Sequence, residues 1–454
     1  MTSNSLFSPA PPAARTDSRM PPARCFRFAA CPLLLALLLA LPAAAGDAPG
    51  WMHALVGVEV PAHDEKTDAV MLYSEELVTV RSTDKIKSIV RVAYKILRPG
   101  GRDYGDVGIP FDSQTRIYNL HAWCIPAQGK DYEVREKDGL ELSLPGVPGS
   151  ELITDIRYKL LRSPAADPGN IVGYEFEQDD RPFFLQDIWR FQQEIPVREA
   201  RYSLQLPQGW EYKATWLNAP EAAVAAGPGN TWSWTVSNLK ALRHEDSMPP
   251  RRGIAGQMIV NFLPPPGTEG ASKFSDWNAI GNWYNGLLRD RLDPSPELKQ
   301  KVAELTSASP TLFGKMAALA QYAQRDVRYV AIELGIGGWQ PHPAAEVLQH
   351  RYGDCKDKVT LMRTMLREIN VESYHLVINT TRGSITPAMP GHMGGFNHAI
   401  VAIRLPADLS DQSLVAIYSH PRLGRLLIFD PTDDMTPFGD LIANASPTSR
   451  IDGG

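Results

Sequence analysis

The stretch Tyr352-Gly-Asp-Cys-Lys-Asp-Lys-Val-Thr-Leu-Met-Arg-Thr-Met-Leu-Arg-Glu-Ile369 decides the fold of the second half of the chain. From Cys355 onward its apolar residues recur at the i, i+3 and i+4 spacing of an amphipathic helix. Gly353 and Asp354 form the turn that opens this helix, and Asp354 is a suitable N-cap. Cys355 therefore falls in the first turn, where the partial positive charge of a helix N-terminus favours a thiolate. An accessible cysteine in this place is a candidate nucleophile.

Two later strands carry the partners that a catalytic thiol needs. The run from Asn397 to Leu405 predicts a strand with His398 at its start, after a loop rich in glycine and proline. The run from Arg425 to Pro431 predicts another strand, with Asp430 at its end. A nucleophile, a base, and an acid that orients the imidazole are the three roles in a Cys–His–Asp triad. Cys355 and these two residues follow one another in that order.

Thiol chemistry of this kind also needs donors for the oxygen of a tetrahedral intermediate. The backbone N–H of Cys355 is one donor, and Trp339 or Gln340, after the Gly337-Gly338 turn, is a candidate for the second. We predict no metal site, because His350 with Cys355 is the one pair with compact ligand spacing and no second pair follows it. No loop has the pattern of a phosphate or calcium site, so no cofactor is expected.

The first half of the mature chain predicts a β-sandwich over residues 51–265. Short alternating runs such as Ile89–Ile96 are separated by turns rich in glycine and proline. Cys124 ends an alternating run that begins at Tyr118, so we expect it to point into the core as a small hydrophobic side chain. After Pro264-Pro-Pro-Gly267 the period becomes helical. The helices are predicted at Trp277–Arg289, Pro296–Leu305 and Leu312–Asp326.

Composition excludes several classes of protein. The 454 residues include 46 Lys and Arg against 51 Asp and Glu, a formal net charge of −5. No basic excess is available to neutralise phosphates, so nucleic acid is not an expected partner. Four cysteines in the whole chain exclude a disulfide scaffold.

The N-terminus predicts an export signal over residues 1–45. Arg24 and Arg27 precede the apolar run Ala29–Leu41, and Pro42-Ala-Ala-Ala45 follows as a small-residue cleavage site. The run is short for a membrane span, which needs about 20 apolar residues, so an uncleaved signal anchor is the alternative. Whether translation starts at Met1 or Met20 stays open.

These motifs resemble the transglutaminase-like superfamily, which has a papain-like fold. In that family Gly-x-Cys opens a helix, His begins a strand, and Asp ends the next strand. Here the matches are Gly353-Asp-Cys355, Asn397-His398-Ala and Phe429-Asp430-Pro431. The resemblance implies that Cys355 is the nucleophile, His398 the general base and acid, and Asp430 the orienting acid. It also implies an α+β protein, in which a β-sandwich is followed by a papain-like core at residues 268–454 with helices before an antiparallel sheet.

The block Glu333–Pro343 and residues 345–348 look like a bacterial exported subgroup, in which a sandwich domain of unknown function precedes the core. The resemblance implies an exported, most simply periplasmic, thiol enzyme that acts on a protein or peptide substrate. It would perform acyl transfer or hydrolysis on peptide or carboxamide bonds, and the sequence does not choose between them. A non-catalytic envelope binding or assembly module on the same scaffold is the alternative. Members of the subgroup continue into a further C-terminal β region, so whether the end at Gly454 is natural or truncated stays open, as does the oligomeric state.

Overall fold

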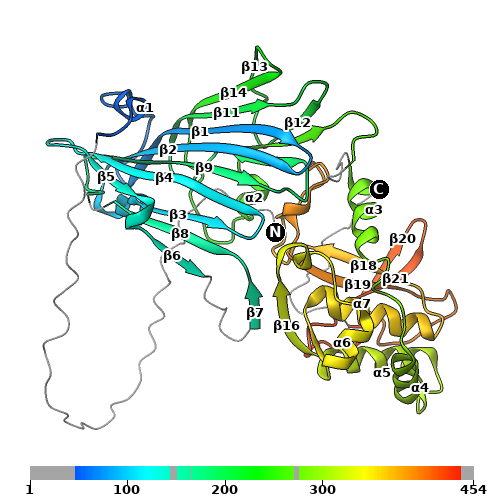
Figure 1. Cartoon of the computed structure of the whole chain (residues 1–454). Helices are drawn as coiled ribbons and strands as arrows, with labels where there is room; N and C mark the ends of the chain where they lie inside the picture. Colours follow the sequence, from blue (N-terminus) through cyan, green and yellow to red (C-terminus); the bar gives the residue numbers. More distant parts are fainter. Residues whose placement is uncertain (1–46, 144–150, 164, 270–275, 441–454) are drawn as a thin grey trace, which may run out of the picture.

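The computed structural model describes residues 47–143, 151–163, 165–269 and 276–440 (Figure 1). The predicted export signal at residues 1–45 and the C-terminal residues 441–454 lie outside this part. Within the described ranges, no helix is both long and apolar enough to cross a membrane.

The N-terminal part is a β-sandwich, as predicted. Its large sheet has the order β13-β14-β11-β1-β2-β9-β4-β5, and the two small sheets β10-β15-β12 and β3-β8-β6 share a core with it. In this large sheet β1 and β11 run parallel, and the other neighbouring pairs run antiparallel. The strands are β1 (Ala69–Ser82), β2 (Lys85–Ile96), β3 (Asp106–Phe111), β4 (Thr115–Ile125), β5 (Tyr132–Arg135), β6 (Leu140–Ser143), β8 (Arg157–Arg162), β9 (Ile171–Asp180), β10 (Gln186–Arg190), β11 (Val197–Gln205), β12 (Glu211–Leu217), β13 (Val224–Gly227), β14 (Thr231–Leu239) and β15 (Gln257–Leu263). Two short helices accompany them, α1 (Gly50–His53) and α2 (Arg251–Ile254).

The core of the sandwich follows the alternation of its strands, with one interruption. In β2 the side chains of Val90, Val92, Tyr94 and Ile96 are all buried, because every second residue of a strand points to the same face. In β4 a bulge lies between Tyr118 and His121. The alternation predicted from Tyr118 to Cys124 therefore holds only after the bulge: Cys124 is buried in the core, but Tyr118 is not in the buried row.

The C-terminal core has helices followed by an antiparallel sheet, which confirms the predicted α+β class. The sheet has the order β18-β19-β21-β20. Helix α7 packs against β18 and β19 and against α4, α5 and α6. The elements are α3 (Trp277–Leu287), α4 (Pro296–Thr306), α5 (Leu312–Arg325), β16 (Arg328–Glu333), η3 (Gly335–Gly338), α6 (Ala344–His350), β17 (Tyr352–Gly353), α7 (Cys355–Glu368), β18 (Ser373–Ile378), η4 (Met393–Gly395), β19 (His398–Arg404), β20 (Ile417–His420) and β21 (Gly424–Phe429).

One strand connects the two parts in a way that the sequence did not predict. Strand β7 (Glu151–Thr154) leaves the sandwich and pairs in parallel with β16 of the C-terminal core (Figure 1). In this sheet β16 lies between β17 and β7. The two parts of the chain therefore share a small sheet as well as their packed surfaces.

Candidate active site

The N-terminus of α7 carries Cys355 in a tightly specified turn. Asp354 is the N-cap: its side chain accepts from the backbone N–H of Asp357 at 3.2 Å, and the Asp357 carboxylate accepts from the N–H of Asp354 at 3.2 Å. This reciprocal capping box fixes where the helix begins. A Cβ at Gly353 would lie 2.5 Å from the Cβ of Asp357, so the turn requires glycine there. Cys355 is the first residue of the helix and is partly exposed.

The structure brings His398 and Asp430 together. The Nε2 atom of His398 lies 2.7 Å from Oδ2 of Asp430. The other carboxylate oxygen accepts from the backbone N–H of Thr432 at 2.8 Å and from its hydroxyl at 2.7 Å. With Nε2 bonded to Asp430, Nδ1 is the ring atom that remains for Cys355, whose side chain lies close enough to raise the pKa of His398. Cys355, His398 and Asp430 are thus brought together from α7, β19 and the end of β21.

The electrostatics of this chain favour a charged imidazole. Burial disfavours the imidazolium form of His398, but the hydrogen bonds and charges of Asp430 and Cys355 outweigh it and raise the pKa of His398 to about 10. Burial also opposes the charge of Asp430, yet the hydrogen bond from His398 holds the pKa of that carboxyl below its usual value. The arrangement therefore stabilises an imidazolium next to a cysteine sulfur.

Two tyrosines flank the cysteine. Tyr329 on β16 lies near Cys355, and burial together with the nearby charges of Cys355 and Asp354 raises the pKa of this tyrosine. Burial is also the main cause of the raised pKa of Tyr284 on α3, and the charge of Cys355 adds to it. Both hydroxyls therefore keep their protons at neutral pH, and the one on Tyr329 can donate to the sulfur.

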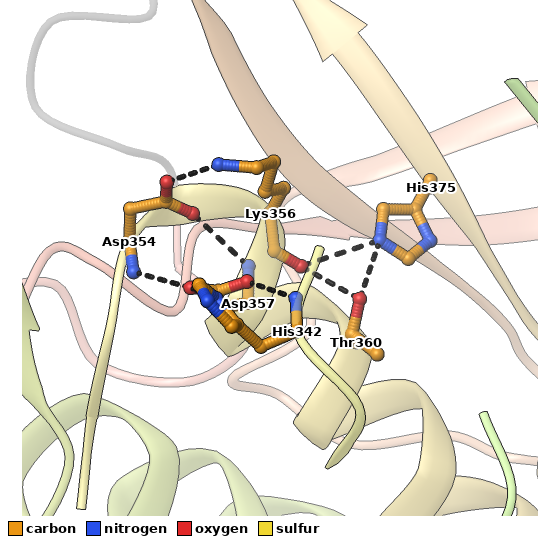
Figure 2. A network of polar contacts seen from close by, with 6 residues as sticks. All are labelled: His342, Asp354, Lys356, Asp357, Thr360 and His375. Atoms are coloured by element: carbon orange, nitrogen blue, oxygen red, sulfur yellow. Dashed lines mark hydrogen bonds and ion pairs between the residues drawn. The ribbon is translucent and has the colours of Figure 1, made fainter. Parts of the chain in front are cut away.

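A buried polar network supports the first turn of α7 (Figure 2). Lys356 pairs with the N-cap carboxylate of Asp354. His342 donates its backbone N–H to Asp357 at 2.8 Å, and its ring lies 3.1 Å from the same carboxylate, which raises the pKa of His342. The buried carboxylates of Asp354 and Asp357 are thereby each paired with a basic side chain, as burial of charge requires.

His375 closes the network on the other side of the helix. Its ring contacts the hydroxyl of Thr360 at 3.2 Å and Arg363 at 2.7 Å (Figure 2 shows the contact with Thr360). Burial, with the charge of Arg363, lowers the pKa of His375 to about 3. This histidine therefore stays neutral, in contrast to His398. Among the residues that the structure describes, no group of three or more His, Cys, Asp or Glu side chains is placed to hold a metal ion.

Trp339 and Gln340 differ in which of their N–H groups already have a hydrogen-bond acceptor. The backbone N–H groups of both donate to the carbonyl of Ile336 at 2.9 and 2.8 Å. The side-chain amide of Gln340 donates to the carbonyl of Leu287 at 3.3 Å. The indole Nε1 of Trp339, by contrast, is buried and meets no acceptor in the described part of the chain. Trp339 packs in one cluster with Tyr284, the tyrosine whose pKa responds to Cys355.

Sequence reasoning missed several residues that shape this site, namely Tyr284, Tyr329, His342 and Asp357 in its supporting role. The one available signal was the Asp-x-x-Asp spacing at the start of α7, which is a variant of the capping-box pattern.

Comparison with family models follows the division of the fold. The model described as the transglutaminase-like superfamily core matches residues 299–408, which include Cys355 and His398. A domain of unknown function with a solved structure, DUF3857, matches residues 83–243 in the sandwich. No curated protein matches the chain.

Among solved structures, a candidate protease from Parabacteroides distasonis has a TM-score of 0.59 and 15% identity. The match covers 74% of this chain and 65% of that protein, so this chain spans just under two thirds of the other's length. At that identity the likeness is one of fold. An M1 zinc metallopeptidase from Deinococcus radiodurans (10% identity, 45% and 44% covered) and the leukotriene A4 hydrolase of Saccharomyces cerevisiae (10% identity, 47% and 33% covered) reach TM-scores of only 0.23 and 0.24, which support no inference.

Proposed function

We infer that this chain, a member of the transglutaminase-like superfamily with a DUF3857 domain in its sandwich, is a thiol enzyme that transfers or hydrolyses acyl groups. The observation that carries the proposal is the position of His398: its ring lies 2.7 Å from Asp430, and its pKa is raised by Cys355, which stands at a helix N-terminus. A base held between an orienting acid and a nucleophile is the arrangement that thiol acyl chemistry requires.

In the proposed reaction the sulfur of Cys355 attacks the carbonyl carbon of a peptide or carboxamide bond. The carbonyl π electrons move to the oxygen, which becomes an oxyanion. As the intermediate collapses, the carbon–nitrogen bond breaks and the leaving amine takes the proton from Nδ1 of His398. A thioester on Cys355 and a neutral imidazole remain. His398 then accepts a proton from water or from an incoming amine, which attacks the thioester carbon. The carbon–sulfur bond breaks, and the Cys355 thiolate leaves beside the imidazolium of His398.

Trp339 is the better candidate for the side-chain donor to the oxyanion. Its buried indole N–H has no acceptor among the described residues, whereas the backbone N–H of Gln340 and one of the two N–H groups of its side-chain amide already have acceptors. A donor that is buried and unpaired before substrate arrives costs little reorganisation when charge develops, which is the property of an oxyanion hole. The backbone N–H of Cys355, at the first position of α7, has no acceptor within its own helix and is proposed as the other donor.

The proposal is tested with p-nitrophenyl acetate, whose acetyl group a reactive thiol accepts. We expect a burst of nitrophenolate equal to one acetyl group per protein, and a mass increase on the peptide that contains Cys355. Adding methylamine then separates the two reactions, because a transferase makes N-methylacetamide while a hydrolase releases acetate.

The control for this experiment is Cys355→Ala, which removes the nucleophile, together with His398→Gln, which removes the base. Both variants should lose the burst. A burst of the same size in Cys355→Ala, or no acetylation of Cys355 in the unaltered protein, would count against an enzyme and favour a binding module on the same scaffold.

A further inference from the structure

The sandwich contributes a buried aromatic side chain to the cluster around Trp339. Phe184, between β9 and β10, is 2% exposed. Its ring meets Trp283 with centroids 4.9 Å apart and Trp339 at 5.5 Å, both edge to face. These three rings belong to one cluster with Tyr284. The indole of Trp339 thus rests on a residue of the other part of the chain.

The same face of the sandwich also holds the loop that leads to His398. Gln186 donates to the carbonyl of Gly391 at 2.9 Å, and Arg252 donates to the carbonyl of Gly394 at 3.0 Å. Met389 is buried in a cluster with β10, β12 and β15. Between β18 and β19, the segment that ends at His398 therefore takes many of its contacts from the sandwich.

A cavity of about 170 Å³ lies behind Phe184, with Arg190, Arg252 and Gly394 also in its wall. Phe184 lines this space and also contacts the indole of Trp339, which is not part of the wall. Truncation of the ring would enlarge this space and remove the nearer of two edge-to-face contacts of the indole, leaving the contact with Trp283 at 6.4 Å.

We propose that Phe184 is a positioning residue for the reaction: the sandwich uses it to hold the indole N–H of Trp339 where the oxyanion develops. This inference rests on the proposed function and assigns a role to the sandwich in it. Phe184 touches no reacting atom; it acts through Trp339. The sandwich is then a structural part of the active site and not an independent module.

The test separates oxyanion binding from thiol reactivity in the full chain. The first probe is N-acetylglycinal with ¹³C at the aldehyde carbon. The sulfur of Cys355 adds to that carbon, the oxygen takes the π electrons and then a proton, and the ¹³C signal reports the thiohemiacetal. The second probe is iodoacetamide, which alkylates the same sulfur and expels iodide without forming an oxyanion.

Phe184→Ala should weaken the aldehyde adduct about tenfold, less than the loss of a whole oxyanion donor, while the rate of alkylation by iodoacetamide stays within about twofold. Phe184→Leu, which keeps the apolar bulk, should recover part of the affinity. The matched control is Phe183→Ala, because Phe183 packs against the same cluster but has no recorded ring contact with Trp339. Its adduct should be unchanged.

A second comparison asks whether Phe184 acts through the indole. Trp339→Phe removes the N–H, and in that background Phe184→Ala should weaken the adduct no further. An equal loss with and without the indole N–H would overturn the proposal, as would full adduct stability in Phe184→Ala. If the unaltered protein neither forms the adduct nor alkylates faster than a free cysteine, the proposed function itself fails.

Discussion

Replacing Asp430 with Asn should return the imidazole of His398 towards ordinary behaviour. The rise in the pKa of His398 from 6.5 to about 10 corresponds to about 5 kcal/mol in favour of the imidazolium. Asp430 and Cys355 supply this energy against the opposing effect of burial. If Asp430 supplies about half of it, the Asp430→Asn variant lowers the pKa by about 2 units, to roughly 8. At pH 9 the ring should then be about 90% protonated in the unaltered protein and about 10% in the variant.

The amide is a poor substitute for a structural reason. The Asp430 carboxylate accepts from His398 through one oxygen and twice from Thr432 through the other. An amide has a single acceptor oxygen, so its NH₂ group must face one of these donors. If the amide oxygen faces His398, the ring loses only its charged partner. If the NH₂ group faces His398, the ring loses the hydrogen bond that orients it as well. We expect kcat for ester or amide substrates to fall by about 10²–10⁴.

Long-range ¹H–¹⁵N spectra of the histidine rings measure this pKa directly, with the His398→Gln spectrum as the assignment. His375, whose pKa is about 3, should not move between pH 5 and 11 and is an internal reference. Asp434→Asn is the matched control, because Asp434 is exposed on the same loop and has no recorded contact with His398. Unchanged titration of His398 in Asp430→Asn, or titration near 6.5 in the unaltered protein, would refute the reasoning.

Measurements of unfolding against pH would not by themselves isolate the effect of the raised pKa of His398. Because the folded pKa of His398 is raised, its stabilising contribution is fully present below pH 6.5 and is lost as the pH rises towards 10. Buried Lys358 has the opposite behaviour, since burial lowers its pKa from 10.5 to about 8. The cost of its charge is fully present below pH 8 and disappears by pH 10.5, so the two windows overlap with opposite signs.

Three further outcomes are expected. Peptide mapping after alkylation of the native protein at pH 8 should find Cys355 modified and Cys124 intact, because burial raises the pKa of Cys124 to about 12; equal labelling would contradict this. Gly253→Ala should lower the free energy of unfolding by about 1–3 kcal/mol, because its Cβ would lie 1.9 Å from the carbonyl oxygen of Gly383. The control Gly281→Ala, on the open face of α3, should not lower it. Urea titration measures the free energy of unfolding of both variants. Lys358→Met should raise the free energy of unfolding by about 2 kcal/mol at pH 7 and should not raise it at pH 10.5. An equal increase at both pH values would exclude the lysine charge as the cause of the stabilisation.

The sequence predicted those parts of the fold that depend on neighbouring residues. Helix α7 begins at Cys355 because the cap, the glycine and the apolar stripe all lie within one run of the chain. The alternation in β2 identified its buried face for the same reason. The bulge at Asn119, with a φ of 52°, was missed because a single left-handed residue leaves no periodic signal.

Contacts between distant segments were not predictable in this way. Strand β7 has partly exposed side chains and no strong pattern, and its partner β16 lies almost 180 residues further on. Tyr329 reaches Cys355 only because β16 lies beside β17, which precedes the cysteine. Phe184 is one apolar residue among many, and only the packed structure distinguishes it from an ordinary core side chain.

The residue types of the proposed site could be predicted from local sequence, whereas its geometry depends on contacts between distant segments. The identities of Cys355, His398 and Asp430 are encoded within the C-terminal core, in elements that pack on one another. The segment from Asn379 to Asn397 is mostly irregular, and within the core the β18–β19 pairing of Ile378 with His398 joins its two ends. Ordering a long irregular segment costs conformational entropy, which the contacts from the sandwich to Gly391 and Gly394 offset. The core alone would therefore keep Cys355, His398 and Asp430 but hold them in a less well-defined geometry. We therefore expect the sandwich to affect the rate of the proposed reaction without taking part in its chemistry.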